Sequence, residues 1–193
     1  MGIAVSVRRR GQAYFETLLA VLVLLAALFG ALQTVFLYGE HVVLHHAAAR
    51  AARAKTVGFN DWMAQKAAHV AAIPFSGRIL GEKVGAAGDG AGASALFESA
   101  RIPEYLAAEN RARAEYVLDY EEWEGGRFSF FEQGGDDGRT VCFAAVHDAP
   151  VFLPFGFLAV PGAGKDEDGT LRFPVAAEGV APDHAWSFLE GSR

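Results

Sequence analysis

The chain cannot form an internal disulfide, because Cys142 is its only cysteine. Its neighbours Val141 and Phe143 favour a buried position for that thiol. The sequence also has no charged residue between Glu16 and Glu40, a gap of 23 residues. A helix of that length reaches about 35 Å, enough to cross a hydrocarbon core of about 30 Å. The sequence therefore predicts that the chain meets a membrane.

The apolar stretch predicts a retained anchor and not a removed secretory signal. It is longer than the usual apolar region of a signal peptide and continues into more helix-favouring sequence without a helix-breaking cleavage site. Three arginines at positions 8–10 and no acid precede it, which favours a cytoplasmic N-terminus and a periplasmic remainder. Basic residues at 50, 53 and 55 oppose this orientation without outweighing it. The remaining residues, about 130, suit one small domain.

Glu16 is unusual, because an ionised carboxylate that enters lipid is costly unless it has water or a partner. One interpretation is the polar start of an ordinary signal anchor at headgroup depth. However, Gly11 lies five residues earlier and the arginine cluster lies directly before Gly11. This order resembles the class III signal of type IV prepilins. The Arg-Gly-Gln-Ala opening at positions 10–13 is most similar to the TadE-like minor pilins of tight-adherence pili.

The resemblance implies processing and assembly roles for three residues. A prepilin peptidase would cut between Gly11 and Gln12, so that residues 1–11 form a leader and Glu16 becomes the fifth mature residue. Glu16 would then pair with the new α-amine of a neighbouring pilin or pseudopilin subunit. Because desolvation of a buried pair can exceed its Coulomb gain, we assign Glu16 to register and assembly and not to net stability.

The resemblance also implies a location and further partners. The chain would cross the bacterial inner membrane once, contact the lipid bilayer and the inner-membrane pilus assembly platform, and enter an extracellular pilus. A nucleic-acid partner, a cofactor and an enzymatic activity are not expected. The alternatives are an uncleaved single-pass envelope protein with a periplasmic binding domain, and a minor pseudopilin of type II secretion.

Residues 12–57 are predicted to form one transmembrane assembly helix, since the alanine-rich part after the membrane contains no proline and only Gly39 weakens it. Within the span, small residues recur at i, i+4 spacing at Ala26, Gly30 and Thr34. Such pairs would permit another helix to approach closely, although small residues are also common in spans by chance.

The remaining sequence predicts an α+β domain. Gly58 should end the long helix, and Asn60 or Asp61 should cap a second helix that runs to Ile73. Residues 58–114 are expected to be a helical section with a Gly/Ala-rich linker at 81–95 and a helix over 103–113. Residues 115–193 are expected to form an antiparallel sheet of three or four strands, at 115–123, 127–131, 140–146 and 171–176. Pro174 would confine the last strand to an edge.

A proline-flanked apolar segment, residues 150–161, carries three phenylalanines, Phe152, Phe155 and Phe157. One interpretation is a loop packed over the sheet or under the helix. The other is an exposed patch that contacts a neighbouring subunit or the membrane surface. A similar segment before the last strand is common in TadE-like proteins, which extends the resemblance weakly into the C-terminal half.

None of the candidate chemical motifs is complete. Residues 162–165 lack the first glycine and the hydroxyl residue of a phosphate-binding loop, and residues 166–169 lack the ligand spacing of a calcium loop. His147 and Asp148 are adjacent on a predicted strand, so they face opposite ways and cannot act together with Cys142. His41 and His45 are spaced to hold a metal but have no third ligand nearby, so no metal site is predicted.

Overall fold

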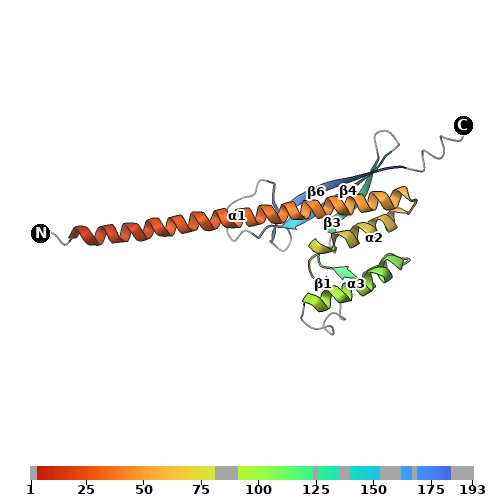
Figure 1. The fold of residues 1–193 in the computed structure, drawn as a ribbon, viewed down its shortest axis with the longest axis horizontal. Helices are drawn as coiled ribbons and strands as arrows, with labels where there is room; N and C mark the ends of the chain where they lie inside the picture. The colour runs from red at the N-terminus through yellow and green to blue at the C-terminus, as the bar shows by residue number, and fades with distance from the viewer. Residues whose placement is uncertain are drawn as a thin grey trace.

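The computed structural model describes residues 4–80, 91–123, 126–134, 140–152, 162–166 and 169–183, with the backbone alone described for residues 4–11, 91–95 and 134. Its dominant element is one helix, α1 (Ala4–Thr56), whose first half extends away from a small α+β domain (Figure 1). The predicted α+β class and the long N-terminal helix are confirmed. The helix also begins eight residues before the predicted start at position 12, so it runs through Gly11.

The connection between the long helix and the second helix follows the sequence prediction closely. Gly58 has a φ of 96°, a left-handed conformation that glycine adopts without strain, and it ends the long helix. The Asn60 side chain then accepts a hydrogen bond of 2.9 Å from the Met63 N–H and caps α2 (Asp61–Ala72). A 3₁₀ turn, η1 (Ile73–Phe75), follows at Pro74. The chain therefore reverses direction, and α2 lies against α1 (Figure 1).

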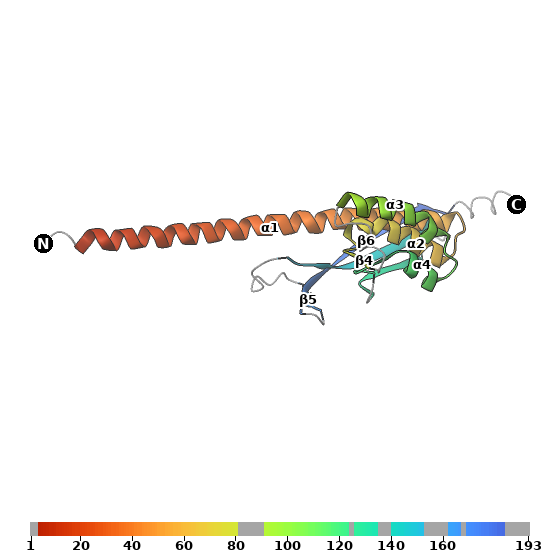
Figure 2. The same cartoon turned by 90° about the horizontal axis from the view of Figure 1, so that it is seen from below.

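The main sheet has four antiparallel strands in the order β3-β4-β6-β5 (Figure 2). The strands are β3 (Phe128–Gly134), β4 (Thr140–Pro150), β5 (Gly164–Lys165) and β6 (Leu171–Pro182). Three predicted strands are thus confirmed, and all three are longer than expected. β5 pairs only with Leu171 and Arg172, so Pro174 lies on a part of β6 that β5 does not cover. This placement satisfies a residue that cannot donate a backbone hydrogen bond.

Two sequence predictions between the helices and the sheet were wrong. Residues 115–117, predicted as the start of a strand, belong to α4 (Arg111–Val117), which Asn110 caps by accepting a hydrogen bond from the Arg113 N–H. Only β2 (Asp119–Tyr120) is extended, and it pairs with β1 (Ile79–Leu80) in a separate two-stranded sheet. The alternation of aromatic residues misled the prediction, because the cap and the buried residues at i, i+3 spacing, Ala114 and Val117, favour a helix.

The predicted linker and third helix also differ from the structure. α3 (Ala91–Ala107) includes the last five residues of the predicted linker 81–95, whose first ten residues lie outside the described range. Pro103 lies inside this helix and not at its start, and the helix ends at Ala107, where the prediction continued to position 113. The alanines at 91, 93 and 95 favour a helix more than the neighbouring glycines suggest.

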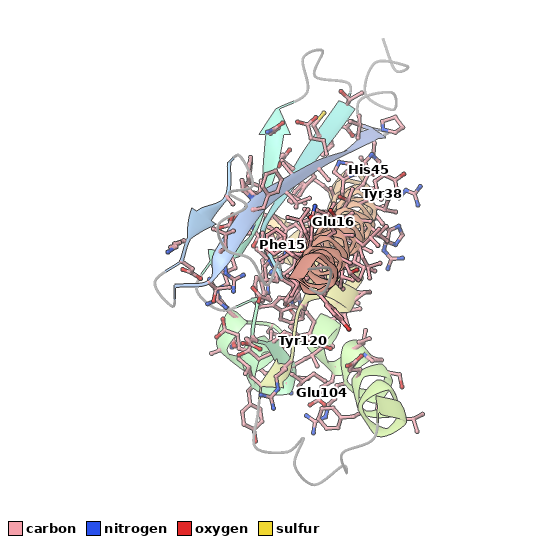
Figure 3. All side chains as sticks on the ribbon, turned by 90° about the vertical axis from the view of Figure 1, so that its left-hand side faces the viewer. Phe15, Glu16, Tyr38, His45, Glu104 and Tyr120 are labelled. Atoms are coloured by element: carbon pink, nitrogen blue, oxygen red, sulfur yellow. The ribbon has the colours of Figure 1, made fainter. Side chains whose placement is uncertain are left out.

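Alanine side chains bring α1 close to both α2 and the sheet. Fully buried alanines recur at i, i+4 spacing on α1 and again on α2: Ala47, Ala48, Ala51, Ala52, Ala64, Ala68 and Ala72. On β6 the buried and exposed residues alternate, so one face packs on α1 and the other faces solvent. Viewed along the helix, the sheet lies on one side of α1 and the shorter helices on another (Figure 3). Small residues therefore permit a core in which backbones nearly touch.

A second cluster of buried residues joins α2 to α3 and α4. The Lys66 ammonium is buried there and donates hydrogen bonds of 2.7 Å to the carbonyl oxygens of Leu106 and Ala108. Burial lowers the pKa of Lys66. Nearby, the His69 ring packs 5.0 Å from both Trp123 and Phe130. Burial, with a smaller contribution from the positive charge of Arg111, lowers the pKa of His69 to about 4.

His69 should make the domain less stable in acid. The unfolded chain binds a proton at His69 below about pH 6.5, whereas the folded chain does so only near pH 4, so stability rises with pH between these values. We expect acidification from pH 7 to pH 4 to cost at most about 3 kcal/mol through this residue. Urea unfolding across this range should show a flatter pH dependence for His69→Gln. The control His45→Gln changes an exposed residue and should keep the pH dependence of the native chain. Equal pH dependence of the free energy of unfolding in the native chain and in His69→Gln would contradict the assignment.

Candidate functional site

No other described part of the protein covers the first half of α1. From Gln12 to Leu32 most residues are exposed and none is buried, although most are large and apolar. This stretch of 21 residues is about 31 Å long at the helical rise, which matches a hydrocarbon core of about 30 Å. α1 is thus long and apolar enough to cross a membrane.

The residues predicted to act in processing and assembly lie at the free end of this stretch. Gly11 and Gln12 are consecutive helical residues. The Gln12 side-chain amide donates a hydrogen bond of 3.3 Å to a Glu16 carboxylate oxygen one turn later. Glu16 is exposed, and it lies in the first half of α1, which extends away from the domain (Figure 1). Its carboxylate is therefore positioned for contact with another molecule and not with the rest of its own chain.

Of the three small residues predicted to pack on another helix, Ala26 and Gly30 lie in the same free half, and the exposed Thr34 lies just after it. A Cβ added at Gly30 would have no atom within 4 Å, so nothing in the described chain occupies that surface. The Thr34 hydroxyl donates a hydrogen bond of 2.9 Å to the Gly30 carbonyl within the helix. Because of this internal bond, the helix face that carries Gly30 and Thr34 presents no unpaired hydroxyl donor, which suits close helix packing in lipid.

The free half ends at Gln33, where the domain first touches α1. Gln33 is only 7% exposed; its amide donates to the Pro150 carbonyl at 3.4 Å and its oxygen accepts from the Phe152 N–H at 2.9 Å. Phe36 makes edge contacts with Phe152 and with Phe75, at 5.5 and 5.3 Å between ring centres. We call these five residues the Gln33 contact. It fixes the end of β4 to the helix at the point where the domain first covers α1.

Phe152 is the one residue of the predicted contact patch that the structure describes. It touches Phe36 and remains 65% exposed, so this one residue is packed on the helix on one side and open on the other. Phe155 and Phe157 lie outside the described residues.

A buried ion pair joins α1 to the sheet two turns after Gln33. Glu40 on α1 is 0% exposed and contacts the Nδ1 atom of His147 on β4, which is 1% exposed. The His147 ring also stacks on Phe128, with 3.8 Å between ring centres. The second Glu40 oxygen has no hydrogen-bond partner among the described residues. A half-satisfied buried carboxylate is costly, so this pair fixes α1 against the sheet at one position along its length.

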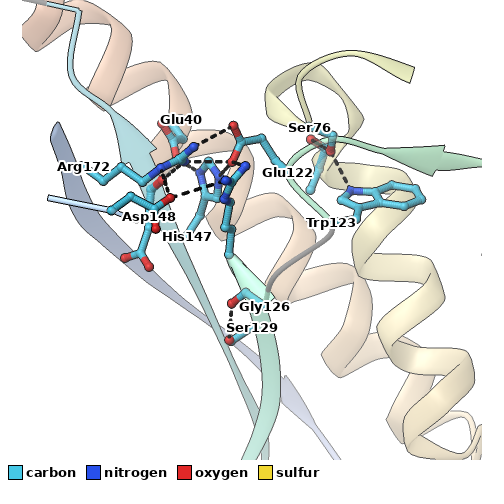
Figure 4. A network of polar contacts seen from close by, with 12 residues as sticks. Glu40, Ser76, Glu122, Trp123, Gly126, Ser129, His147, Asp148 and Arg172 are labelled. Atoms are coloured by element: carbon cyan, nitrogen blue, oxygen red, sulfur yellow. Dashed lines mark hydrogen bonds and ion pairs between the residues drawn. The ribbon is translucent and has the colours of Figure 1, made fainter. Parts of the chain in front are cut away.

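The pair belongs to a larger polar cluster (Figure 4). Glu122 lies 3.5 Å from the His147 Nε2 atom and accepts a 2.9 Å hydrogen bond from the Nη1 atom of Arg172. Asp166 lies 3.0 Å from Arg172 and 3.4 Å from Arg127, which also lies 3.8 Å from Glu122. Three carboxylates thus meet two guanidinium groups and the His147 imidazole in one cluster.

Sequence reasoning missed this cluster, although signals for it exist. Glu40 marks the end of the uncharged stretch, and it recurs with Leu37, Leu44, Ala47 and Ala51 on the helix face that proves to be buried. His147 falls on the buried phase of the β4 alternation, between Ala145 and Ala149, whereas Asp148 is exposed. The separation of 107 positions between the partners could not be inferred without the fold.

The motifs set aside in the sequence take other places in the fold. Gly164 and Lys165 form β5, and Asp166 joins the ion cluster. Cys142 lies half-buried on β4 with no disulfide partner, where the sequence favoured full burial. In the described part of the chain, no group of three or more histidine, cysteine, aspartate or glutamate residues could hold a metal.

Comparison with protein-family models, with curated proteins and with solved structures gives no significant match for this chain. The resemblance to TadE-like minor pilins thus rests on the residues around Gly11 and Glu16 and on the segment at 150–161.

Proposed function

We propose that this protein is a minor pilin or pseudopilin of the TadE type, cut after Gly11 by a prepilin peptidase and assembled through α1. One observation carries the proposal: the stretch from Gln12 to Leu32 is apolar, uncovered and of lipid length, and it ends at the Gln33 contact. Length alone does not separate an assembly helix from a simple anchor, because a helix that only anchored a domain would need the same length. The carboxylate of Glu16, at the end remote from the domain, favours an assembly role.

In this proposal the chain crosses the inner membrane once and places its domain in the periplasm. Removal of residues 1–11 creates an α-amine at Gln12, and Glu16 of a neighbouring subunit pairs with it. The Gln12 to Glu16 hydrogen bond within one chain is weak at 3.3 Å and is readily exchanged for a charged partner. The domain is attached to α1 at the Gln33 contact and the Glu40–His147 pair, so it moves with the helix into the pilus.

Glu16→Ala should leave processing nearly unchanged but reduce recovery of the subunit in sheared pili by at least about tenfold. The reason is that an unpaired α-amine in an apolar bundle costs more than the about 1.4 kcal/mol that a tenfold loss requires. Immunoblots of pilus and membrane fractions measure both quantities. Glu104→Ala, which removes an exposed carboxylate on α3, is the matched control and should assemble normally. Normal incorporation of the Glu16 variant would remove the assembly role.

A further inference from the structure

A cleft of about 620 Å³ opens between α2, α4 and β3, and no residue of α1 lines it. Its volume falls within the range of about 300 to 1,000 Å³ that is usual for small-molecule sites. β3 is the edge strand of the main sheet, and the Gln65 amide covers its free edge by donating a 3.2 Å hydrogen bond to the Phe130 carbonyl. This contact satisfies the carbonyl that an added strand would use, so the cleft is better suited to a compact ligand than to an extended peptide.

Aromatic rings form much of the cleft wall: Trp62, Tyr105, Trp123, Phe128, Phe130 and Phe131. Trp123 is fixed in place, because its indole N–H donates a 2.8 Å hydrogen bond to Ser76 and its ring packs 4.6 Å from Tyr120. Trp62 lies under the Lys66 ammonium, 5.5 Å from its ring centre. Rigid aromatic faces offer apolar contact area at little entropic cost, so this wall is organised before any ligand arrives.

Polar groups line the rest of the cleft and are also held in place. The Arg111 Nε atom donates a 2.7 Å hydrogen bond to Glu115 one turn later on α4. Both side chains are more than half exposed, so their remaining donor and acceptor atoms face solvent at the rim. Asp119 and Gln65 add a carboxylate and an amide. The cleft therefore combines a flat apolar wall with several directional hydrogen-bonding groups.

The charges in the cleft favour a neutral ligand. Glu115 and Asp119 would repel an anion, and only one cationic residue, Arg111, lines the described cleft. A cation gains little, because Glu115 already accepts a hydrogen bond from Arg111 and an Asp119 oxygen accepts one from the Tyr120 N–H. A pyranose ring meets both requirements, because its C–H face packs on an aromatic ring while its hydroxyl groups donate and accept hydrogen bonds.

We propose that this cleft is a binding site for a neutral saccharide of one or two pyranose rings, such as a unit of a cell-surface or cell-envelope glycan. In this site the sugar stacks on Trp62 or Trp123, and Arg111 and Glu115 bind its hydroxyl groups. The proposal does not depend on processing or pilus assembly, since every residue in it belongs to the domain beyond α1. A subunit with this site would attach to glycans.

Saturation-transfer NMR on the full chain in detergent tests the site with four probes: diacetylchitobiose, maltose, glycine betaine as a cation, and inorganic phosphate as an anion. We expect transfer to at least one of the two sugars and none to the charged probes. Arg111→Ala and Glu115→Ala should each weaken sugar binding by at least about fivefold, because each removes hydrogen bonds made only at the rim. Both residues are exposed, so neither change should unfold the domain.

Arg113→Ala is the matched control, since this exposed arginine lies on the same helix but does not line the cleft, and it should bind as the native chain does. Trp62→Ala should abolish the transfer, with near-ultraviolet circular dichroism to establish that the fold is retained. The proposal is overturned if neither sugar receives saturation, if only betaine or phosphate does, or if Arg111→Ala and Glu115→Ala bind sugar as tightly as Arg113→Ala.

Discussion

Glu40→Leu is expected to lower the free energy of unfolding of the domain by about 3 to 5 kcal/mol. Glu40 and His147 are almost fully buried, and removal of the carboxylate leaves the imidazole without its partner inside a polar cluster that already contains Arg172. A buried polar group that loses its partner costs more than the pair itself contributes. Urea unfolding followed by tryptophan fluorescence measures the loss, since Trp123 directly follows Glu122 of the cluster (Figure 4).

The double variant Glu40→Leu/His147→Leu separates the two possible causes of that loss. If the cost comes from the unpaired partner, the double variant should recover most of the stability, because both buried polar groups are then replaced by apolar ones. Glu178→Leu, an exposed position on β6, is the control and should change stability by less than about 0.5 kcal/mol. A loss below about 1 kcal/mol for Glu40→Leu would show that the pair does not hold α1 to the sheet.

Gly179→Ala is expected to destabilise the domain by about 3 kcal/mol or more. A Cβ at Gly179 would overlap the backbone of Ala48 and Ala49 on α1, and it would come within 2.6 Å of the Ala48 carbonyl oxygen. Backbone atoms cannot rotate away as a side chain can, so β6 and α1 would have to separate along the whole alanine-lined contact. The same unfolding experiment measures this effect.

Gly164→Ala provides the control for the glycine substitution. Gly164 also lies in the main sheet, but a Cβ there would have no atom within 4 Å, and its backbone is not left-handed. We therefore expect no more than about 0.5 kcal/mol of change. Equal stabilities for the two alanine variants would mean that β6 does not pack as closely on α1 as the structure indicates.

Local signals in the sequence were enough to predict the elements that local physics determines. The uncharged stretch predicted the long helix, Gly58 its end, and Asn60 the cap of α2, since a left-handed glycine and an N-terminal side-chain acceptor act within a few residues. The three long strands were found from their turns and apolar content, but β4 and β6 extend further because they pair with each other over 11 residues. Pairing of that length depends on a distant segment.

The remaining features depend on contacts between distant residues. The segment around Tyr116 was misassigned, because aromatic alternation there suggested a strand while the Asn110 cap determines a helix. The alanines at 47–52 were attributed to helix propensity, whereas they also form the surface that contacts β6 and α2. The Glu40–His147 pair and the aromatic cleft combine residues from several elements, so no spacing in the sequence predicts them.

The N-terminus of the mature chain tests the central proposal most directly. The full chain should be produced together with a prepilin peptidase, extracted from membranes and analysed by intact mass and N-terminal sequencing, with Gly11→Val as the variant expected to stay uncut. The proposal predicts a chain that begins at Gln12 and retains Glu16 as its fifth residue. A chain that still begins at Met1 or Gly2 in the presence of an active peptidase would contradict it and would favour an uncleaved anchor.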